Sequence, residues 1–304
     1  MCPAPATTDL DELLKAEGTR TFEVRGRTSR AEGWFDLACA RARLFALDAI
    51  AREGLVMLPG DSWGQGAISA LLEGLKRQPD SAAAELLGVL SFDVHPDRLR
   101  RGMIEFFRRS ADNAKLGRFA LRACSALFRD EGDVAAADRC SNLALQRGVD
   151  STWQSISLAR SAFQHGDISQ GLGRFAAAAA SIRDEDDRVA LDWHLDWFLE
   201  PAELAEWDSL ATSRAEWVRN LLAERDLRDG QPDGSRLAEH FSRLEAVDTL
   251  FRLRRPLLRQ RRFELTASPE NILSYEWVAK WVDKDPAGVP ARPFRFYQRK
   301  HPEY

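Results

Sequence analysis

Two overlapping segments decide the fold. Residues 113–147 read NAKLGRFALRACSALFRDEGDVAAADRCSNLALQR, and residues 147–181 read RGVDSTWQSISLARSAFQHGDISQGLGRFAAAAAS. The pair Gly132-Asp133 in the first segment recurs as Gly166-Asp167 in the second, an offset of 34 in residue number (166 minus 132). A period of this length is typical of helix–turn–helix repeats that stack into a solenoid. The pattern therefore predicts an all-α protein built from helical hairpins.

Small side chains recur at matching places in the two copies. The matching pairs are Ser125 with Ala159, Ala137 with Gly171, and Ala144 with Ala178. Small residues allow the two helices of a hairpin to cross closely. Glycine readily adopts the left-handed conformation that ends a helix, and an aspartate after it can cap the next helix. We therefore expect each Gly-Asp pair to form the turn of a hairpin.

This arrangement resembles the tetratricopeptide repeat family. The residues that carry the resemblance are the two Gly-Asp turns, the small residues Ala137, Gly171, Ala144 and Ala178, and the large residue Phe175. Two positions depart from the family pattern, because Ser141 replaces a large residue and Val149 stands where a terminal proline is usual. The resemblance implies a stack of hairpins that binds a peptide or protein on its concave face. An ordinary helical bundle is the alternative.

More degenerate copies extend the repeat towards the N-terminus. Ala67 and Met103 occupy the place of Ala137, so four hairpins fit residues 34–183. Residues 1–33 are interpreted as a tether and linker, with one short helix that Gly18 ends and a polar loop after it.

The part of the chain after residue 183 has a different character. The sequence of residues 184–283 predicts a Trp-rich helical region. Within it, Ser213-x-x-Glu216 is expected to form a capping box. Residues 284–304 predict an irregular tail, and we expect the natural chain to continue past Tyr304. Roughly residues 190–304 are also similar to the region that precedes a GWxTD-type domain in some bacterial repeat proteins. The residues carrying this likeness are Trp207-Asp208, Arg214–Trp217, Arg225-Asp226, Arg236–Phe241 and Arg299–Tyr304.

Charge and cysteine usage bear on the compartment. Lys and Arg total 43 against 47 Asp and Glu, a net charge of −4, which argues against general nucleic-acid binding. Cys39, Cys124 and Cys140 are interpreted as buried small hydrophobic residues, with a disulfide between Cys124 and Cys140 as an alternative. Cys2 precedes a Pro/Ala-rich tether, as the lipidated cysteine of a bacterial lipoprotein does. A cell-envelope or periplasmic location is therefore slightly favoured over the cytoplasm.

The repeat frame also nominates binding residues. First-helix positions should face the concave surface, which gives the candidates Arg118, Arg122, Gln154 and Arg160. One basic cluster offers an alternative nucleic-acid or lipid contact; its members are Arg252, Arg254, Arg255, Arg259, Arg261 and Arg262.

Motifs for catalysis, metal or cofactors are not evident. The His-carboxylate neighbours His194-Leu-Asp196 and Glu239-His240 lack the second histidine of a zinc-protease motif. We interpret them as surface or satisfied polar residues, and we expect no cofactor and no metal. The leading hypothesis is a non-catalytic interaction scaffold. The alternatives are an accessory region of an enzyme whose catalytic domain lies beyond Tyr304, and a nucleic-acid-linked regulator.

Overall fold

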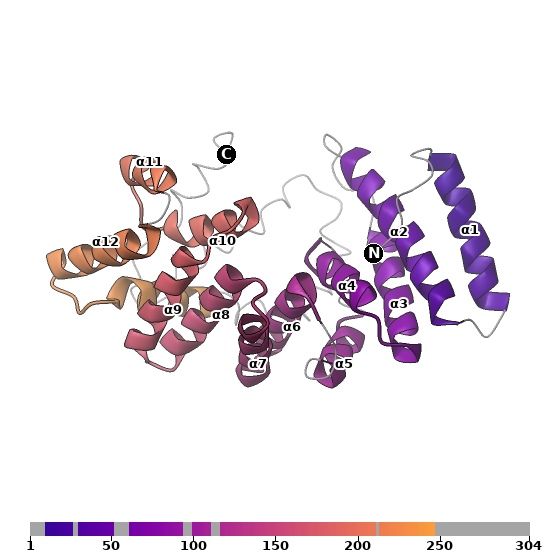
Figure 1. Ribbon diagram of the computed structural model, residues 1–304, viewed down its shortest axis with the longest axis horizontal. Helices are drawn as coiled ribbons and strands as arrows, with labels where there is room; N and C mark the ends of the chain where they lie inside the picture. The colour runs from indigo at the N-terminus through magenta and orange to yellow at the C-terminus, as the bar shows by residue number, and fades with distance from the viewer. Residues whose placement is uncertain are drawn as a thin grey trace, which may run out of the picture. The chain divides into compact units, whose positions relative to one another are not determined.

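The computed structural model describes residues 10–26, 30–51, 61–93, 99–110, 116–210 and 213–246. Within these residues all regular secondary structure is helical, so the prediction of an all-α protein is confirmed (Figure 1). The helices are α1 (Leu10–Gly26), α2 (Ala31–Ala51), α3 (Asp61–Arg77), α4 (Ser81–Asp93), α5 (Arg100–Ser110), α6 (Arg118–Glu131), α7 (Val134–Gln146), α8 (Ser151–Gln164), α9 (Ile168–Ala180), α10 (Glu185–Leu195), α11 (Pro201–Ser209) and α12 (Arg214–Arg228). Residues 235–246 are helical as well.

The chain forms two compact units, Met1–Ser161 and Ala162–Tyr304. The division falls inside α8.

Helices α1, α2 and α3 lie side by side in the first unit (Figure 1). Arg41 of α2 joins them, because its Nε donates to Glu17 Oε1 of α1 (2.9 Å) and its Nη1 donates to the Gly66 carbonyl of α3 (3.2 Å). The predicted stop at Gly18 was wrong, since α1 continues to Gly26. Packing against α2 outweighs the modest helix penalty of one glycine, which is about 1 kcal/mol.

Helix α4 approaches α6 at backbone distance. A Cβ added to Gly88 would lie 2.4 Å from the carbonyl carbon of Phe119, so only glycine fits at this crossing. One turn earlier in α4, the carboxylate of Glu85 accepts from the Phe119 amide (2.9 Å) at the start of α6. A carboxylate at this end satisfies an amide that has no partner within its own helix. Helix α4 therefore supplies the cap that α6 lacks in its own sequence.

The two predicted Gly-Asp turns share one geometry. Gly132 has φ 83° and Gly166 has φ 76°, both left-handed, as the Gly-Asp pattern predicts. Asp133 has φ −85° and ψ 71°, and Asp167 has φ −84° and ψ 78°. Each aspartate accepts from a backbone amide in the first turn of the following helix at 3.0 Å, which caps α7 and α9 respectively. Backbone bonds from the glycine and the aspartate also close the preceding helix in the same way at both turns.

The small residues of the repeat lie in the interior. Ser125, Ala137, Ala144, Ala159 and Ala178 are each at most 1% exposed. Gly171 is also buried, and a Cβ there would lie 2.6 Å from the Phe163 ring. The burial predicted for these positions is thus confirmed.

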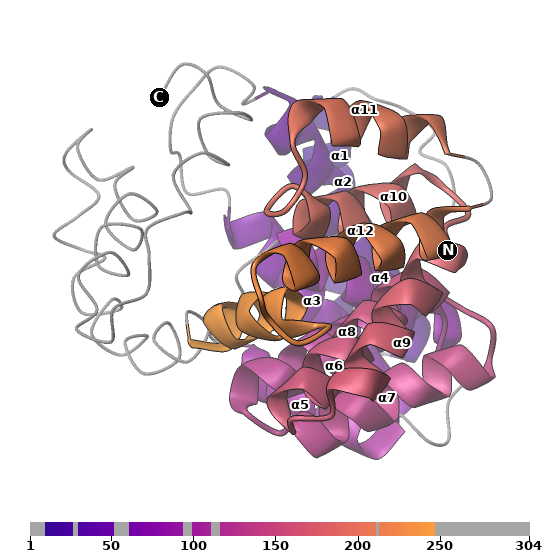
Figure 2. The same cartoon turned by 90° about the vertical axis from the view of Figure 1, so that its left-hand side faces the viewer.

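In the second unit α9 and α12 lie side by side (Figure 2). Phe175 of α9 and Phe241 from the helical residues 235–246 are almost fully buried and meet edge to face, with ring centroids 6.1 Å apart. Gly234 has φ 86° and packs against Ile168, so it supplies both a left-handed turn and a close approach. The buried Asp226 accepts from the Gly234 amide (2.8 Å) and holds this turn closed.

The helix starts of the second unit follow the sequence in two cases and depart from it in a third. Asp184 caps α10 through the Asp187 amide (2.9 Å), and Pro201 occupies the first turn of α11, where proline is favoured. The capping box predicted at Ser213 was wrong, because the Ser213 side chain makes no cap hydrogen bond. Glu203 instead accepts from the Glu200 backbone amide (2.7 Å) at the start of α11.

Candidate functional site

In the first unit, one buried carboxylate accepts hydrogen bonds from side chains of α6 and α8. Asp150 lies between α7 and α8 with φ 54°, a left-handed value that aspartate tolerates better than most residues. Its side chain is fully buried. Arg118 Nε donates to one carboxylate oxygen (3.0 Å) and Arg122 Nε to the other (3.0 Å). Two guanidinium groups therefore compensate the desolvation of one carboxylate.

Gln154 completes this cluster from the first turn of α8. Its Nε2 donates to Asp150 Oδ2 (3.1 Å), while its buried Oε1 has no hydrogen-bond partner within the described ranges. The guanidinium of Arg122 also lies over two aromatic rings, at 5.6 Å from the Phe119 centroid and 5.0 Å from that of Trp153. Arg122 is consequently fixed by charge and by stacking.

Three of the four predicted groove residues thus meet at one point. Arg118, Arg122 and Gln154 converge on Asp150, which was not among the predicted residues. Arg118 keeps about a quarter of its side chain exposed, whereas Arg122 is 7% exposed. Arg160 is half-buried on α8. Whether any of the four contacts a partner stays a prediction. The basic cluster Arg252–Arg262 and Cys2 lie outside the described residues.

A second polar network lies between α6, α7 and α8. The hydroxyl of Ser125 is 2.9 Å from that of Ser141 and 3.0 Å from that of Ser157. Arg129 Nη2 donates to the Ser157 carbonyl (3.0 Å) and to Ser161 Oγ (2.7 Å), and Ser161 donates to Asp138 (2.6 Å). Small residues at the crossings therefore also carry hydrogen bonds, which fix how these helices are aligned.

The cysteines beside this network form a disulfide. Cys124 of α6 and Cys140 of α7 are bonded, with Cα atoms 6.0 Å apart, and both are at most 1% exposed. The predicted burial of these two residues is confirmed, whereas their interpretation as unbonded residues was wrong and the disulfide alternative was right. Cys39 is disulfide-bonded as well, so the same interpretation was wrong for it. Their spacing of 16 residues places them opposite each other across the hairpin.

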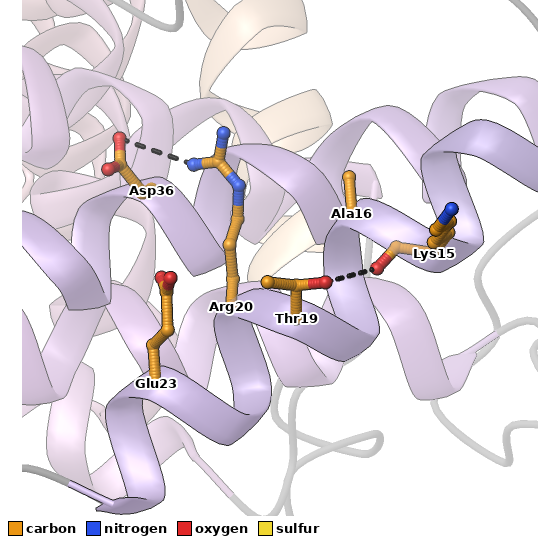
Figure 3. A pocket seen from close by; sticks show the side chains of 6 residues that line it. All are labelled: Lys15, Ala16, Thr19, Arg20, Glu23 and Asp36. Carbon is orange, nitrogen blue, oxygen red and sulfur yellow. Dashed lines mark hydrogen bonds and ion pairs between the residues drawn. The ribbon is translucent and has the colours of Figure 1, made fainter.

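An open groove between α1 and α2 carries charges of both signs (Figure 3). Its lining residues are Lys15, Ala16, Thr19, Arg20, Glu23 and Asp36. Arg20 reaches across it to Asp36 (3.4 Å), and the Asp36 side chain is 60% exposed. An ion pair this exposed contributes at most about 1 kcal/mol. The mixed, solvated lining gives this groove no evident chemistry.

The second unit contains a buried pair of histidines. His194 Nδ1 of α10 and His240 Nε2 lie 2.9 Å apart, and the two residues are 9% and 7% exposed. Aromatic rings surround the pair; they belong to Phe175, Trp193, Trp197, Phe198 and Phe241. Of the two interpretations offered for these histidines, the surface one was wrong, since both are buried. The interpretation as satisfied polar residues fits, since each is a hydrogen-bond partner of the other. No local pattern signals a pair that is 46 residues apart.

The acidic helix α10 of the second unit binds a guanidinium group and an indole of α11. Arg188 pairs with Asp192 (2.9 Å) and Asp208 (3.1 Å), and Asp192 accepts from Trp207 Nε1 (2.8 Å). Burial raises the pKa of Asp192, while the Trp207 hydrogen bond and Arg188 oppose that rise. The group links α10 to α11.

Among the described residues there is neither a metal-binding cluster nor a membrane-spanning helix. No cluster of three or more His, Cys, Asp or Glu side chains there could hold a metal ion. None of the helices described there combines the length and apolar character needed to cross a bilayer. The chain matches no protein-family model, no curated protein sequence and no solved structure.

Proposed function

We propose that this chain is a non-catalytic scaffold that binds a peptide or protein segment. The contact face would be formed by the first helices of the hairpins, α6 and α8. The observation that carries the proposal is the turn geometry that Gly132-Asp133 and Gly166-Asp167 share. It supports a hairpin array, and it supports the resemblance to tetratricopeptide repeats. Such arrays present a continuous surface that one hairpin alone cannot provide.

The Asp150 cluster supports the same proposal. Rigid side chains lose little entropy when a partner binds, and Arg118 and Arg122 are already held in place. About a quarter of the Arg118 side chain is exposed, and this part of the guanidinium side chain would contact the partner. Arg122 acts mainly as a support, because nearly all of it is buried.

Site-directed photo-crosslinking in cells that naturally produce the chain tests the proposal. The probe amino acid replaces Arg160 of α8 in one variant and Ala126 of α6 in another; both residues are half-buried. Controls carry the probe at Arg139 and Asn142, which are exposed on α7. The proposal expects the same crosslinked polypeptide from the two first-helix positions and none from α7. Equal crosslinking from α7, or no crosslink from α6 and α8, contradicts it.

We also propose that the protein works in the cell envelope. The buried Cys124–Cys140 disulfide supports this, because such bonds persist mainly in oxidising compartments. Alkylation of thiols in intact cells, followed by mass analysis, tests the location. If the protein is in the envelope, Cys124 and Cys140 should carry no alkyl label when the protein is denatured without reduction. Alkylation of these two cysteines in the freshly denatured, unreduced protein contradicts an envelope location.

A further inference from the structure

We infer that the His194–His240 pair is a pH-sensitive latch that joins α10 to the helical residues 235–246. The two facing nitrogens are 2.9 Å apart, and each belongs to a different helix of the second unit. The inference does not depend on the proposed binding function, since it concerns other residues.

The bond needs a specific proton arrangement. A neutral imidazole has one N–H and one bare nitrogen, whereas a protonated imidazole has two N–H groups. His194 Nδ1 and His240 Nε2 can share a hydrogen bond only if one donates and the other accepts. The neutral pair satisfies this, and so does a pair that has taken up one proton. When both rings are protonated, two N–H groups face each other and two positive charges lie side by side.

The surroundings oppose the second proton as well. Both imidazoles are more than 90% buried among aromatic rings, so water solvates them poorly. Burial in a medium of low polarity disfavours the charged form of a histidine. The ring contacts from α9 and α10 place Phe175 and Trp193 against His194.

Charged groups also lie on the elements packed around the pair. They are Arg174 on α9; Glu185, Asp186, Asp187, Arg188, Asp192 and Asp196 on or just after α10; and Arg236, Glu239, Arg243 and Glu245 in the helical residues 235–246. Asp192 accepts from Trp207 and pairs with Arg188, and Glu239 pairs with Arg243. Asp187 accepts from the Arg183 amide at the start of α10. A carboxylate near the pair favours uptake of the first proton. Uptake of the second proton still places two N–H groups face to face.

The direction of the effect follows from proton counting. In the unfolded chain both imidazoles become protonated below the ordinary histidine pKa of about 6.5. The closed latch then binds one proton fewer than the open state, so acid favours opening. For each proton that the closed state does not bind, the ratio of closed to open latch falls by up to tenfold per pH unit below that pKa. Between pH 6.5 and pH 5.0 the closed-to-open ratio should fall roughly 10- to 20-fold.

Hydrogen exchange of the full chain measures this opening locally. Protection factors, corrected for the intrinsic pH dependence of exchange, are taken for peptides covering 188–195 and 235–246. Wild type should lose protection roughly 10- to 20-fold between pH 6.5 and pH 5.0. His240→Gln should remove most of that loss, because a neutral amide can replace Nε2 as donor or acceptor. The control His165→Gln changes an exposed histidine and should behave as wild type.

Two results overturn the latch. One is unchanged protection of wild type down to pH 5.0, and the other is an equal acid loss in wild type and His240→Gln. If the amides of His240→Gln are already unprotected at pH 7.5, this variant cannot test the latch. An NMR pH titration of the histidine signals of wild type then tests it instead. Two separate protonation steps for His194 and His240 support the latch. Simultaneous protonation of both near pH 6.5 overturns it.

Discussion

The substitution Gly88→Ala tests the close approach of α4 to α6. An ideal Cβ at residue 88 would lie 2.4 Å from the Phe119 carbonyl carbon and 2.5 Å from the Ala120 nitrogen. Both obstacles are backbone atoms of α6, so no side-chain rotation can relieve the overlap. Normal contact requires the helices to separate by about 1 Å, which also weakens the cap that Glu85 provides at Phe119.

The expected cost combines three effects. Overpacking a close contact costs about 1–3 kcal/mol, and a weakened helix cap adds about 0.5–2 kcal/mol. Alanine in a helix interior returns about 1 kcal/mol relative to glycine. The free energy of unfolding of the first unit should therefore fall by about 0.5–4 kcal/mol, with a central value of about 2 kcal/mol.

Urea unfolding of the full chain, followed by circular dichroism, measures this loss. The matched control is Gly18→Ala in α1 of the same unit, where an added Cβ meets nothing within 4 Å. That variant should be as stable as wild type or up to about 1 kcal/mol more stable. If Gly88→Ala is also neutral or stabilising, α4 and α6 do not approach at backbone distance and the packing argument is refuted.

Three further substitutions follow from the structure. Asp150→Asn keeps the left-handed backbone but leaves Arg122 buried without its carboxylate. The free energy of unfolding in urea should therefore fall by about 3–5 kcal/mol, and a fall below about 1 kcal/mol contradicts the role given to the cluster. Replacing Cys124 and Cys140 together by alanine should lower the free energy of unfolding by about 3 kcal/mol, the value for a loop of about 15 residues. Peptide mass analysis should show that the linked peptides carrying Cys124 and Cys140 gain two hydrogens on reduction. Because burial raises the pKa of Asp192, the folded state binds its proton more readily than the unfolded state. Wild type should therefore gain stability relative to Asp192→Asn as pH falls from 7 towards 4; a constant difference across that range contradicts this sign.

Local patterns in the sequence predicted local structure well. The Gly-Asp turns, the aspartate caps and the buried small residues depend on neighbours in the chain, and all three occur as expected. Two local predictions failed: Gly18, where contacts with α2 keep the helix intact, and Ser213, whose side chain makes no cap hydrogen bond. Propensity alone could not reveal that the helix continues through Gly18, because the opposing contribution comes from Arg41 in the next helix.

Long-range polar contacts could not be read from the sequence. Glu85 caps a helix that begins in a later part of the chain, and His194 meets a partner 46 residues away. The repeat frame did select Arg118 and Arg122, yet it gave no sign that both bind Asp150. Such contacts depend on how helices pack, and charge patterns along one helix carry no information about that.

The central claim is that residues 113–181 contain two copies of one hairpin repeat. Deletion of one full period tests this claim most directly. Removing Asp133–Gly166 joins Gly132 to Asp167 and so rebuilds the same Gly-Asp turn. The control removes residues 133–156, a segment shorter than a whole period, and so joins Gly132 to Ser157. Cooperative unfolding is measured for both variants by circular dichroism in urea. The account predicts a cooperative transition for the full-period deletion and its loss for the control; equal behaviour of the two deletions contradicts the repeat.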